Sequence, residues 1–425
     1  MAEINTRKRG TKWEYRFEAA RINGKRNQIT KGGFKTKKEA LEEGTKALAQ
    51  YNLAGKHFEP SEISVSDALD YWVTAYAIPN LATATVTAYQ NIIKNHVKPR
   101  IGFYKLKAVD TPVLQDMVNA IYVERGFTKA FMNNILKVIK GSFKYFAKTA
   151  KFITYNPAID VSCPKFEPVQ KGKSILEKDE VKKMLERFKK SPYQYYALLI
   201  AYYTGLRVSE VYGLTWNDID FENSTLSVNQ IVKDRDTDAV PGRRPIKGKS
   251  IRKWYLGACK TPSSYRTIKI GETLLNGLKE YKEWQETNEK EYGEYYIKHY
   301  LKEEKLPNGR TEYRIISQDT TSGYEVPLKR AYLVMVKENG EFHGTDSMKY
   351  PSKVARFELG IDFKFHNLRH THATMLVENE APVKDVSERL GHSDIRTTMN
   401  TYVTNTAAMK TKSMNIFEDI GNLNK

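Results

Sequence analysis

The sequence predicts a multidomain protein made of a small α+β unit, an all-α unit and a larger, mainly α (α+β) unit. Its 425 residues exceed the usual size of a single domain. Apolar residues alternate near the N-terminus and then recur with helical spacing, and two polar segments, residues 54–61 and 161–173, have the composition of linkers. We therefore expect three units, over residues 1–58, 62–165 and 174–425.

The first unit is expected to hold a short sheet followed by one helix. Residues 13–17 alternate between apolar and polar side chains, as a half-buried strand does, and Asn23-Gly24 is a strong signal for a two-residue hairpin turn. We expect a third short strand near Phe34. The motif Thr36-x-x-Glu39 is a capping box and predicts the start of the helix.

The second unit is predicted to be entirely helical. Proline and glycine residues separate its periodic apolar stretches, and Asn156-Pro157 closes the last of them. Helices are expected over residues 65–72, 86–97, 113–122 and 131–146.

The third unit begins with two helical stretches, over residues 178–189 and 193–204, and a strand-like run over residues 225–231. A basic insertion over residues 233–260 follows. For residues 271–362 the pattern indicates helices and loops, and it assigns no chemistry to them.

The chain is strongly basic, with a formal net charge of +19 and an isoelectric point near 9.4. Such a charge favours a polyanionic partner, and basic residues interleaved with Tyr and Trp suit nucleic acid better than a membrane. The basic first unit either enters a DNA groove or presents a solvated face. The two cysteines imply no disulfide framework and fit a reducing cytoplasm. Composition alone leaves a ribosomal or RNA-binding protein open.

Polar clusters in the third unit indicate chemistry on a phosphate. Arg207 follows Gly205, which permits a tight turn, and Glu210 can brace its guanidinium. Arg369 and His392 stand in two further clusters near the C-terminus. Negative charge develops on the non-bridging oxygens of a phosphodiester under attack. Planar guanidinium groups stabilise that charge with paired hydrogen bonds.

Two plainer interpretations compete with this one. His366 and His370 are four residues apart, so with His372 they could share a helix and bind a metal. No cysteine or carboxylate joins them at ligand spacing, and an arginine stands between them. Tyr402, taken alone, is most simply a core or surface aromatic residue.

The three motifs together, in this order, resemble the tyrosine recombinase family, the integrases of phages and conjugative transposons of Gram-positive bacteria. The matching strings are TGLRxSE at residue 204, HxLRHTxAT at residue 366 and LGHxxxxTTxxxY at residue 390. The resemblance implies an arm-type DNA-binding domain, a core-binding helical domain and a catalytic domain with a C-terminal tail for the three units. It also implies six catalytic residues: Arg207, Lys260, His366, Arg369, His392 and the nucleophile Tyr402.

The resemblance assigns a role to each of these residues. Tyr402 would form a 3′-phosphotyrosyl link, two arginines and His392 would bind the scissile phosphate, and His366 would be the general base. Lys260, in the string KTxxSxR, would be the general acid, in preference to the other lysines of the insertion. Those alternatives are Lys247, Lys249 and Lys253. Because the covalent link conserves the bond energy, neither a metal nor another cofactor is expected.

The resemblance further implies integration and excision of a mobile element. The expected partners are double-stranded DNA at crossover and arm-type sites, a homotetramer on that DNA, and an excisionase or host DNA-bending protein; no membrane partner is expected. The setting would be the bacterial cytoplasm, in association with the nucleoid. A type IB topoisomerase, which reseals the original strand, and a catalytically silent architectural DNA-binding protein are the alternatives.

The tail beyond Tyr402 carries apolar residues at helical spacing. It is expected either to fold back on its own domain or to dock on a neighbouring subunit. The residues concerned are Met409, Ile416, Phe417 and Ile420.

Overall fold

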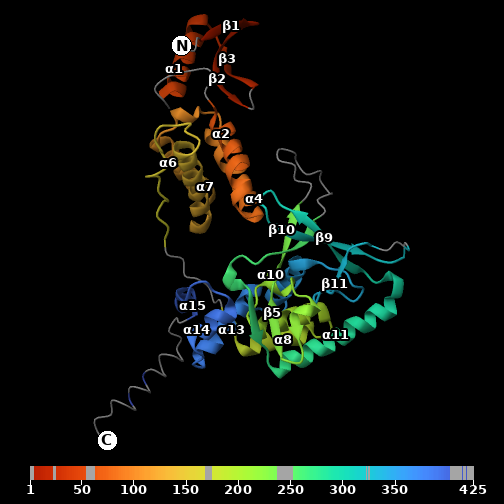
Figure 1. The fold of residues 1–425 in the computed structure, drawn as a ribbon. Helices are drawn as coiled ribbons and strands as arrows, with labels where there is room; N and C mark the ends of the chain where they lie inside the picture. The colour runs from red at the N-terminus through yellow and green to blue at the C-terminus, as the bar shows by residue number, and fades with distance from the viewer. Residues whose placement is uncertain are drawn as a thin grey trace. The chain divides into compact units, whose positions relative to one another are not determined.

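The computed structural model describes residues 4–22, 25–53, 63–167, 175–236, 252–321, 323 and 326–402, together with Met414 and Glu418. The chain divides into two compact units. The first comprises residues 1–169 with 307–309, and the second comprises residues 170–306 with 310–425 (Figure 1). None of the described helices is both long and apolar enough to cross a membrane.

The first unit opens with a three-stranded antiparallel sheet and one helix (Figure 1). Its elements are β1 (Asn5–Arg9), β2 (Lys12–Ile22), β3 (Lys25–Phe34) and α1 (Lys37–Leu53). Tyr15 and Phe17, on the alternating strand, are buried together with Tyr51 of α1. The predicted hairpin is confirmed by the pairing of β2 with β3, although its turn at residues 23–24 lies outside the described residues. The predicted helix cap is confirmed, because Thr36 Oγ1 accepts the Glu39 N–H at 3.1 Å.

The third strand of this sheet is β1, and the prediction of a separate third strand near Phe34 was wrong. Phe34 ends β3 and pairs with Trp13. The sequence of β1, Asn-Thr-Arg-Lys-Arg, is almost wholly polar and mostly exposed. An edge strand of this kind buries too little apolar surface to produce an alternating pattern.

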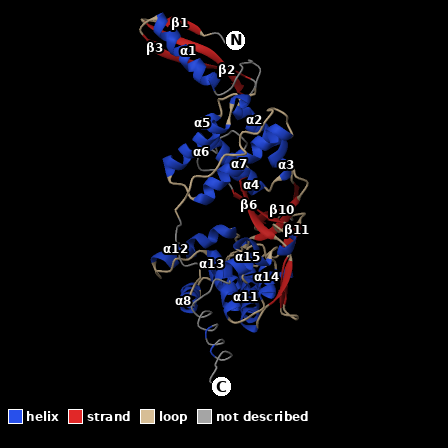
Figure 2. Cartoon of the chain, turned by 90° about the vertical axis from the view of Figure 1, so that its left-hand side faces the viewer, coloured by secondary structure: helices blue, strands red, loops and turns tan. Residues whose placement is uncertain are grey.

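The rest of the first unit is helical, as predicted (Figure 2). Its four helical stretches bury one core that includes Trp72 and Phe143. Two of them contain a π-helical segment, at residues 73–77 and 93–97, which the periodicity does not predict. The α-helices are α2 (Val65–Trp72), α3 (Ile78–Asn80), α4 (Thr83–Ile92), α5 (Lys98–Ile101), α6 (Thr111–Arg125) and α7 (Lys129–Lys148).

The second unit is organised around the apolar helix α9, which contacts α8, α10, α11 and α13. Ala197, Ile200 and Ala201 of α9 are completely buried. The helices are α8 (Lys178–Phe188), α9 (Pro192–Thr204), α10 (Val208–Val211), α11 (Glu272–Tyr292), α12 (Lys349–Phe357), α13 (Phe365–Glu378), α14 (Val383–Leu390) and α15 (Ile395–Tyr402).

The described residues of this unit also form two antiparallel sheets. One has the order β4-β5-β8 and the other the order β11-β9-β10-β7-β6. The strands are β4 (Ile219–Asp220), β5 (Thr225–Val228), β6 (Ile231–Asp236), β7 (Arg252–Gly257), β8 (Arg266–Lys269), β9 (Lys298–Lys305), β10 (Thr311–Gln318) and β11 (Lys329–Ala331).

The strands β9, β10 and β11 correct the prediction of only helices and loops for residues 271–362. Charged residues fill β9, and its apolar residues do not alternate over its length. β10 pairs with its neighbour β9 along its whole length and also with β7, more than fifty residues earlier, which places the segment in a larger sheet. Local pattern alone does not contain that partner.

Several predicted features fall outside the described residues. Lys247 and Lys249 are among them, whereas Lys253 lies on β7. The apolar tail residues Met409, Ile416, Phe417 and Ile420 also lie outside the described part of the chain.

Candidate active site

Arg207 is presented by a turn at the end of α9. Gly205 ends that helix with φ +69°, and a Cβ on it would lie 2.8 Å from atoms of both His372 and Leu390. The chain therefore needs glycine here, both for the left-handed backbone and for the close packing. Arg207 then caps α10, and Glu210 accepts hydrogen bonds from its backbone N–H at 3.0 Å and its Nη1 at 2.7 Å. The predicted brace is confirmed.

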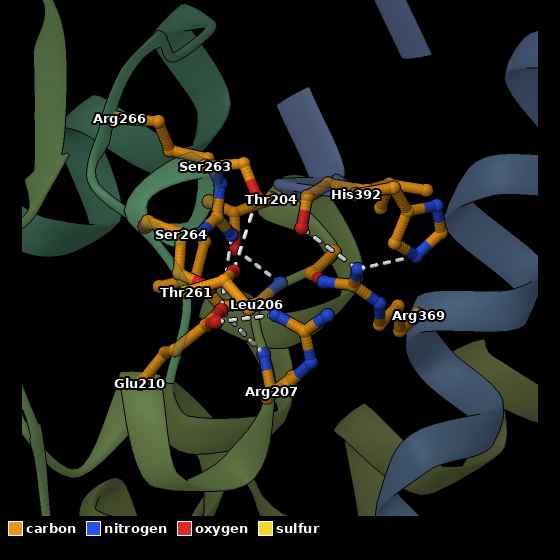
Figure 3. Close-up of polar contacts among 12 residues, drawn as sticks. Thr204, Leu206, Arg207, Glu210, Thr261, Ser263, Ser264, Arg266, Arg369 and His392 are labelled. Carbon is orange, nitrogen blue, oxygen red and sulfur yellow. Dashed lines mark hydrogen bonds and ion pairs between the residues drawn. The ribbon is translucent and has the colours of Figure 1, made fainter. Parts of the chain in front are cut away.

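Glu210 is itself held by a second arginine that the sequence reasoning did not assign. Arg266 Nη2 donates to Glu210 Oε2 at 2.9 Å, and both side chains are almost completely buried (Figure 3). Burial alone would raise the pKa of Glu210, but the charge and hydrogen bond of Arg266 and the backbone N–H of Arg207 lower it overall. Glu210 is therefore a carboxylate shared by two guanidinium groups.

Arg369, on α13, is only 1% exposed. Its Nη1 donates to the Gly205 carbonyl at 2.9 Å, and its Nη2 donates to the Leu390 carbonyl at 2.7 Å. These carbonyls belong to the turns that precede Arg207 and His392, so one side chain joins two segments of the site (Figure 3).

His392 follows Gly391, which ends α14 with φ +70°. Its Nε2 lies 2.9 Å from Arg369 Nη2, which is a donor, and its Nδ1 lies 2.8 Å from Thr398 Oγ1. His392 therefore accepts at Nε2 and carries its proton on Nδ1. Burial and the charge of Arg369 lower the pKa of His392 to about 4, so the ring is neutral at neutral pH.

His366 lies in the first turn of α13, and its ring packs edge-to-face against that of His370, with ring centroids 4.5 Å apart. Desolvation by the surrounding chain, followed by the charges of His370 and Arg369, lowers the pKa of His366 to about 4. Arg207 and Glu210 also act on this pKa, so His366 shares the electrostatic environment of these two residues. A neutral imidazole at pH 7 is able to accept a proton.

Lys260 is exposed and lies on the connection between β7 and β8, which belong to different sheets. It lines a pocket of about 350 Å³ together with Arg207 and His392. The resemblance implies a lysine on a β-hairpin, but here a short turn at residues 262–264 separates Lys260 from β8. The structure describes Tyr402 only as the last residue of α15, which packs on α13 and α14.

His372 does not support the metal-binding interpretation. Its Nδ1 lies 2.9 Å from the Tyr202 carbonyl, to which it donates, and its Nε2 accepts from Arg389 Nε at 3.0 Å. Burial and the charge of Arg389 lower the pKa of His372 to about 4, so both ring nitrogens are occupied in a neutral ring. The sequence reasoning missed Arg389 and Arg266, because their partners come from distant segments.

The chain belongs to the phage integrase family, whose model matches residues 174–409. Residues 5–50 match an arm DNA-binding domain, and residues 64–122 match the N-terminal SAM-like domain of phage integrases. The protein is therefore a tyrosine-type site-specific recombinase, of the integrase class that mobile elements carry, as the sequence motifs predicted.

Relatives match along most of the chain. A tyrosine recombinase XerC-like protein of Caldanaerobacter subterraneus is 27% identical over 91% of this chain and 90% of its own length. The ICEBs1 integrase of Bacillus subtilis is 22% identical over 86% of each chain.

Two solved structures show the same fold. The Tn1549 transposon integrase in complex with a circular intermediate DNA superimposes with a TM-score of 0.58 at 19% identity, covering 83% of this chain and 99% of that one. A lambda integrase dimer bound to a COC′ core site gives a TM-score of 0.54 at 17% identity and covers 94% of each chain.

Proposed function

We propose that this recombinase integrates and excises a mobile element by cutting and rejoining double-stranded DNA through a 3′-phosphotyrosyl intermediate on Tyr402. The observation that supports this most directly is the pocket that Arg207, Lys260 and His392 line, with the buried Arg369 hydrogen-bonded to His392 behind it. Those groups would surround a phosphodiester with positive charge and hydrogen-bond donors.

The proposed reaction has two balanced steps. The Tyr402 hydroxyl attacks phosphorus and gives its proton to His366, while the bond to the 5′ oxygen breaks and Lys260 protonates that oxygen. Arg207 and Arg369 stabilise the pentacoordinate transition state. The 5′ hydroxyl of a partner strand then gives its proton to the neutral Lys260 and attacks the phosphotyrosine, while His366 returns its proton to the departing Tyr402 oxygen. Both residues regain their starting protonation states, and no external energy source is needed.

His392 has a more specific part in this scheme than phosphate binding alone. Because its Nε2 accepts from Arg369, we propose that it orients that guanidinium and turns toward the phosphate when DNA binds. The neutral ring avoids placing a further positive charge beside the arginines.

The division into an arm-type domain at residues 1–58, a core-binding domain at 62–165 and a catalytic domain at 174–425 remains part of the proposal. Deleting residues 1–58 should weaken binding to distant arm-type DNA sites and spare the crossover site, and the lost affinity should depend steeply on salt. Footprinting at several salt concentrations tests this. Equal losses at both kinds of site would assign the segment to the main DNA clamp.

We also propose assembly as a homotetramer on DNA, association with the bacterial nucleoid, and control by an excisionase or a DNA-bending protein. The lambda integrase has been solved as a tetramer bound to a Holliday junction, in a fold that this chain shares. Cross-linking of the protein on a two-site DNA would test the tetramer.

The decisive test of the reaction is a nicked suicide duplex that traps the covalent adduct. Digestion and mass spectrometry should place the DNA on Tyr402. A second assay with two distinguishable DNA sites separates recombination from topoisomerase activity, because only a recombinase exchanges the flanking sequences. Relaxation of supercoils without exchange would favour a topoisomerase, and binding without any adduct would favour an architectural protein.

A further inference from the structure

We propose that Arg266 is a positioning residue that locks the Lys260 loop, the Arg207 turn and the His392 turn into one cleavage-competent arrangement. This inference rests on the proposed function. It concerns a side chain to which neither the motifs nor the comparisons assign a role.

The guanidinium of Arg266 makes three hydrogen bonds in three directions. Nη2 donates to Glu210 Oε2 at 2.9 Å, Nε donates to the Arg389 carbonyl at 2.6 Å and Nη1 donates to the Ser264 carbonyl at 3.0 Å. The side chain is only 7% exposed. Its partners therefore belong to the Arg207 turn, to the end of α14 before His392, and to the turn that follows Lys260.

Close packing at Gly391 supports the same junction independently. A Cβ on Gly391 would lie 2.9 Å from the Ser263 carbonyl and 3.1 Å from Arg266 Nη1. The loop that carries Lys260 thus lies directly against the turn that presents His392. Since φ at Gly391 is +70°, both the backbone and the space require glycine.

Only an arginine satisfies these three acceptors at once. A lysine keeps the positive charge beside Glu210, but its single ammonium group cannot reach a carboxylate and two carbonyls that lie in different directions. Without the fork, the Lys260 loop loses its bond to α14, and Glu210 loses the partner that fixes it beneath Arg207. Arg266 therefore acts through both the proposed general acid and a phosphate-binding arginine.

Replacing the 5′ leaving oxygen of the DNA by sulfur distinguishes the effect of Arg266 on Lys260 from its effect on Arg207. A duplex with a 5′-bridging phosphorothiolate releases a thiolate, which needs little protonation, so misplacement of Lys260 is tolerated while misplacement of Arg207 is not. For Arg266→Ala we expect single-turnover cleavage to fall about 100-fold on the ordinary duplex and about 10-fold on the phosphorothiolate duplex. Complete rescue would overturn the route through Arg207, and no rescue would overturn the route through Lys260.

A control variant and a conservative variant test whether the loss of cleavage comes only from a general loss of folding. Arg187, on α8, forms a solvent-exposed ion pair with Glu358 at 2.7 Å and does not line the pocket, so Arg187→Ala should cleave both duplexes as the wild type does. Arg266→Lys should fold and show the same pattern with a smaller loss. Equal losses on both duplexes for Arg266→Lys would indicate a merely structural role and refute the proposal.

A readout without DNA distinguishes failure of this inference from failure of the proposed function. Trypsin should cut after the exposed Lys260 faster in Arg266→Ala and Arg266→Lys than in the wild type or Arg187→Ala, because the loop has lost its anchor. Unchanged cutting would overturn the anchoring role even if the wild type recombines. Adduct formation by the wild type tests the proposed function separately.

Discussion

The two arginines proposed to bind the phosphate are held in opposite ways. Arg207 is 35% exposed and rests on a buried carboxylate, Glu210, which a second arginine shares. Arg369 is 1% exposed and rests on two main-chain carbonyls and a neutral histidine. The first region is organised by charge, and the second is organised by the backbone of the fold.

This difference predicts different consequences when each arginine or its partners are mutated. An arginine braced by a carboxylate depends on ionic partners that can be removed one at a time, with the helices left in place. An arginine whose donors satisfy buried carbonyls is part of the protein interior, so its loss also leaves backbone acceptors unsatisfied. The variants below test this contrast, in order of their expected effect on cleavage.

Tyr402→Phe should abolish cleavage while leaving DNA affinity nearly unchanged, because only the nucleophilic oxygen is removed. Both arginine regions would then still bind a phosphate that nothing attacks. Adduct formation on the suicide duplex and a gel shift measure the two effects. A Phe variant that still forms the adduct would assign the nucleophile to another residue.

Arg369→Lys should reduce cleavage by much more than about tenfold, or about 1.4 kcal/mol of barrier, although it keeps the charge. It should also lower the free energy of unfolding by about 1–3 kcal/mol, since the carbonyls of Gly205 and Leu390 lose donors. Single-turnover kinetics and urea denaturation measure these quantities.

Arg207→Lys is the matched comparison for that variant. Its side chain is partly exposed and its ion pair to Glu210 can be kept by an ammonium group, so stability should change by less than about 1 kcal/mol. If both lysine variants lose the same stability, the contrast between the two regions is wrong.

Glu210→Gln should reduce cleavage about tenfold, because Arg207 loses its charged brace while keeping its place in the chain. The buried Arg266 would lose its ionic partner, which should lower stability by about 3 kcal/mol. The double variant Glu210→Gln, Arg266→Ala should lose less stability than the two single variants added together, because both changes break the same hydrogen-bond network. Simple additivity in this double-mutant cycle would show that the two residues act independently.

His372→Gln should have the smallest effect on cleavage and a clear effect on the pH dependence of stability. In the unfolded chain His372 binds a proton below about pH 6.5, whereas the folded pKa is about 4. Its contribution to the free energy of unfolding is therefore present above pH 6.5 and is lost as the pH falls toward 4.

Thermal melting between pH 7 and pH 4 tests this sign. The Gln variant should lose less stability on acidification than the wild type does. His299, His366 and His392 also have pKa values lowered to about 4, so part of the wild-type slope should remain. A variant with an unchanged slope would show that His372 does not titrate as described.

Much of the fold and the identity of the candidate site follow from local sequence. The α2 and α7 helices occur where apolar periodicity predicts them, because that signal involves residues within a few turns of one another. The brace between Arg207 and Glu210 was also readable, since its partners are three residues apart. The same holds for the left-handed turn at Gly205.

Only the tertiary structure decided which distant groups complete the site. Arg266 meets Glu210 and Arg389 across separations of 56 and 123 residues, and pairing with β7 joins the β9–β10 hairpin to the strands of an earlier segment. No local period records such partners, because their contacts form only when separate helices and strands pack together. The motifs indicated the candidate reacting groups, whereas long-range burial and hydrogen bonding determined what holds them in place.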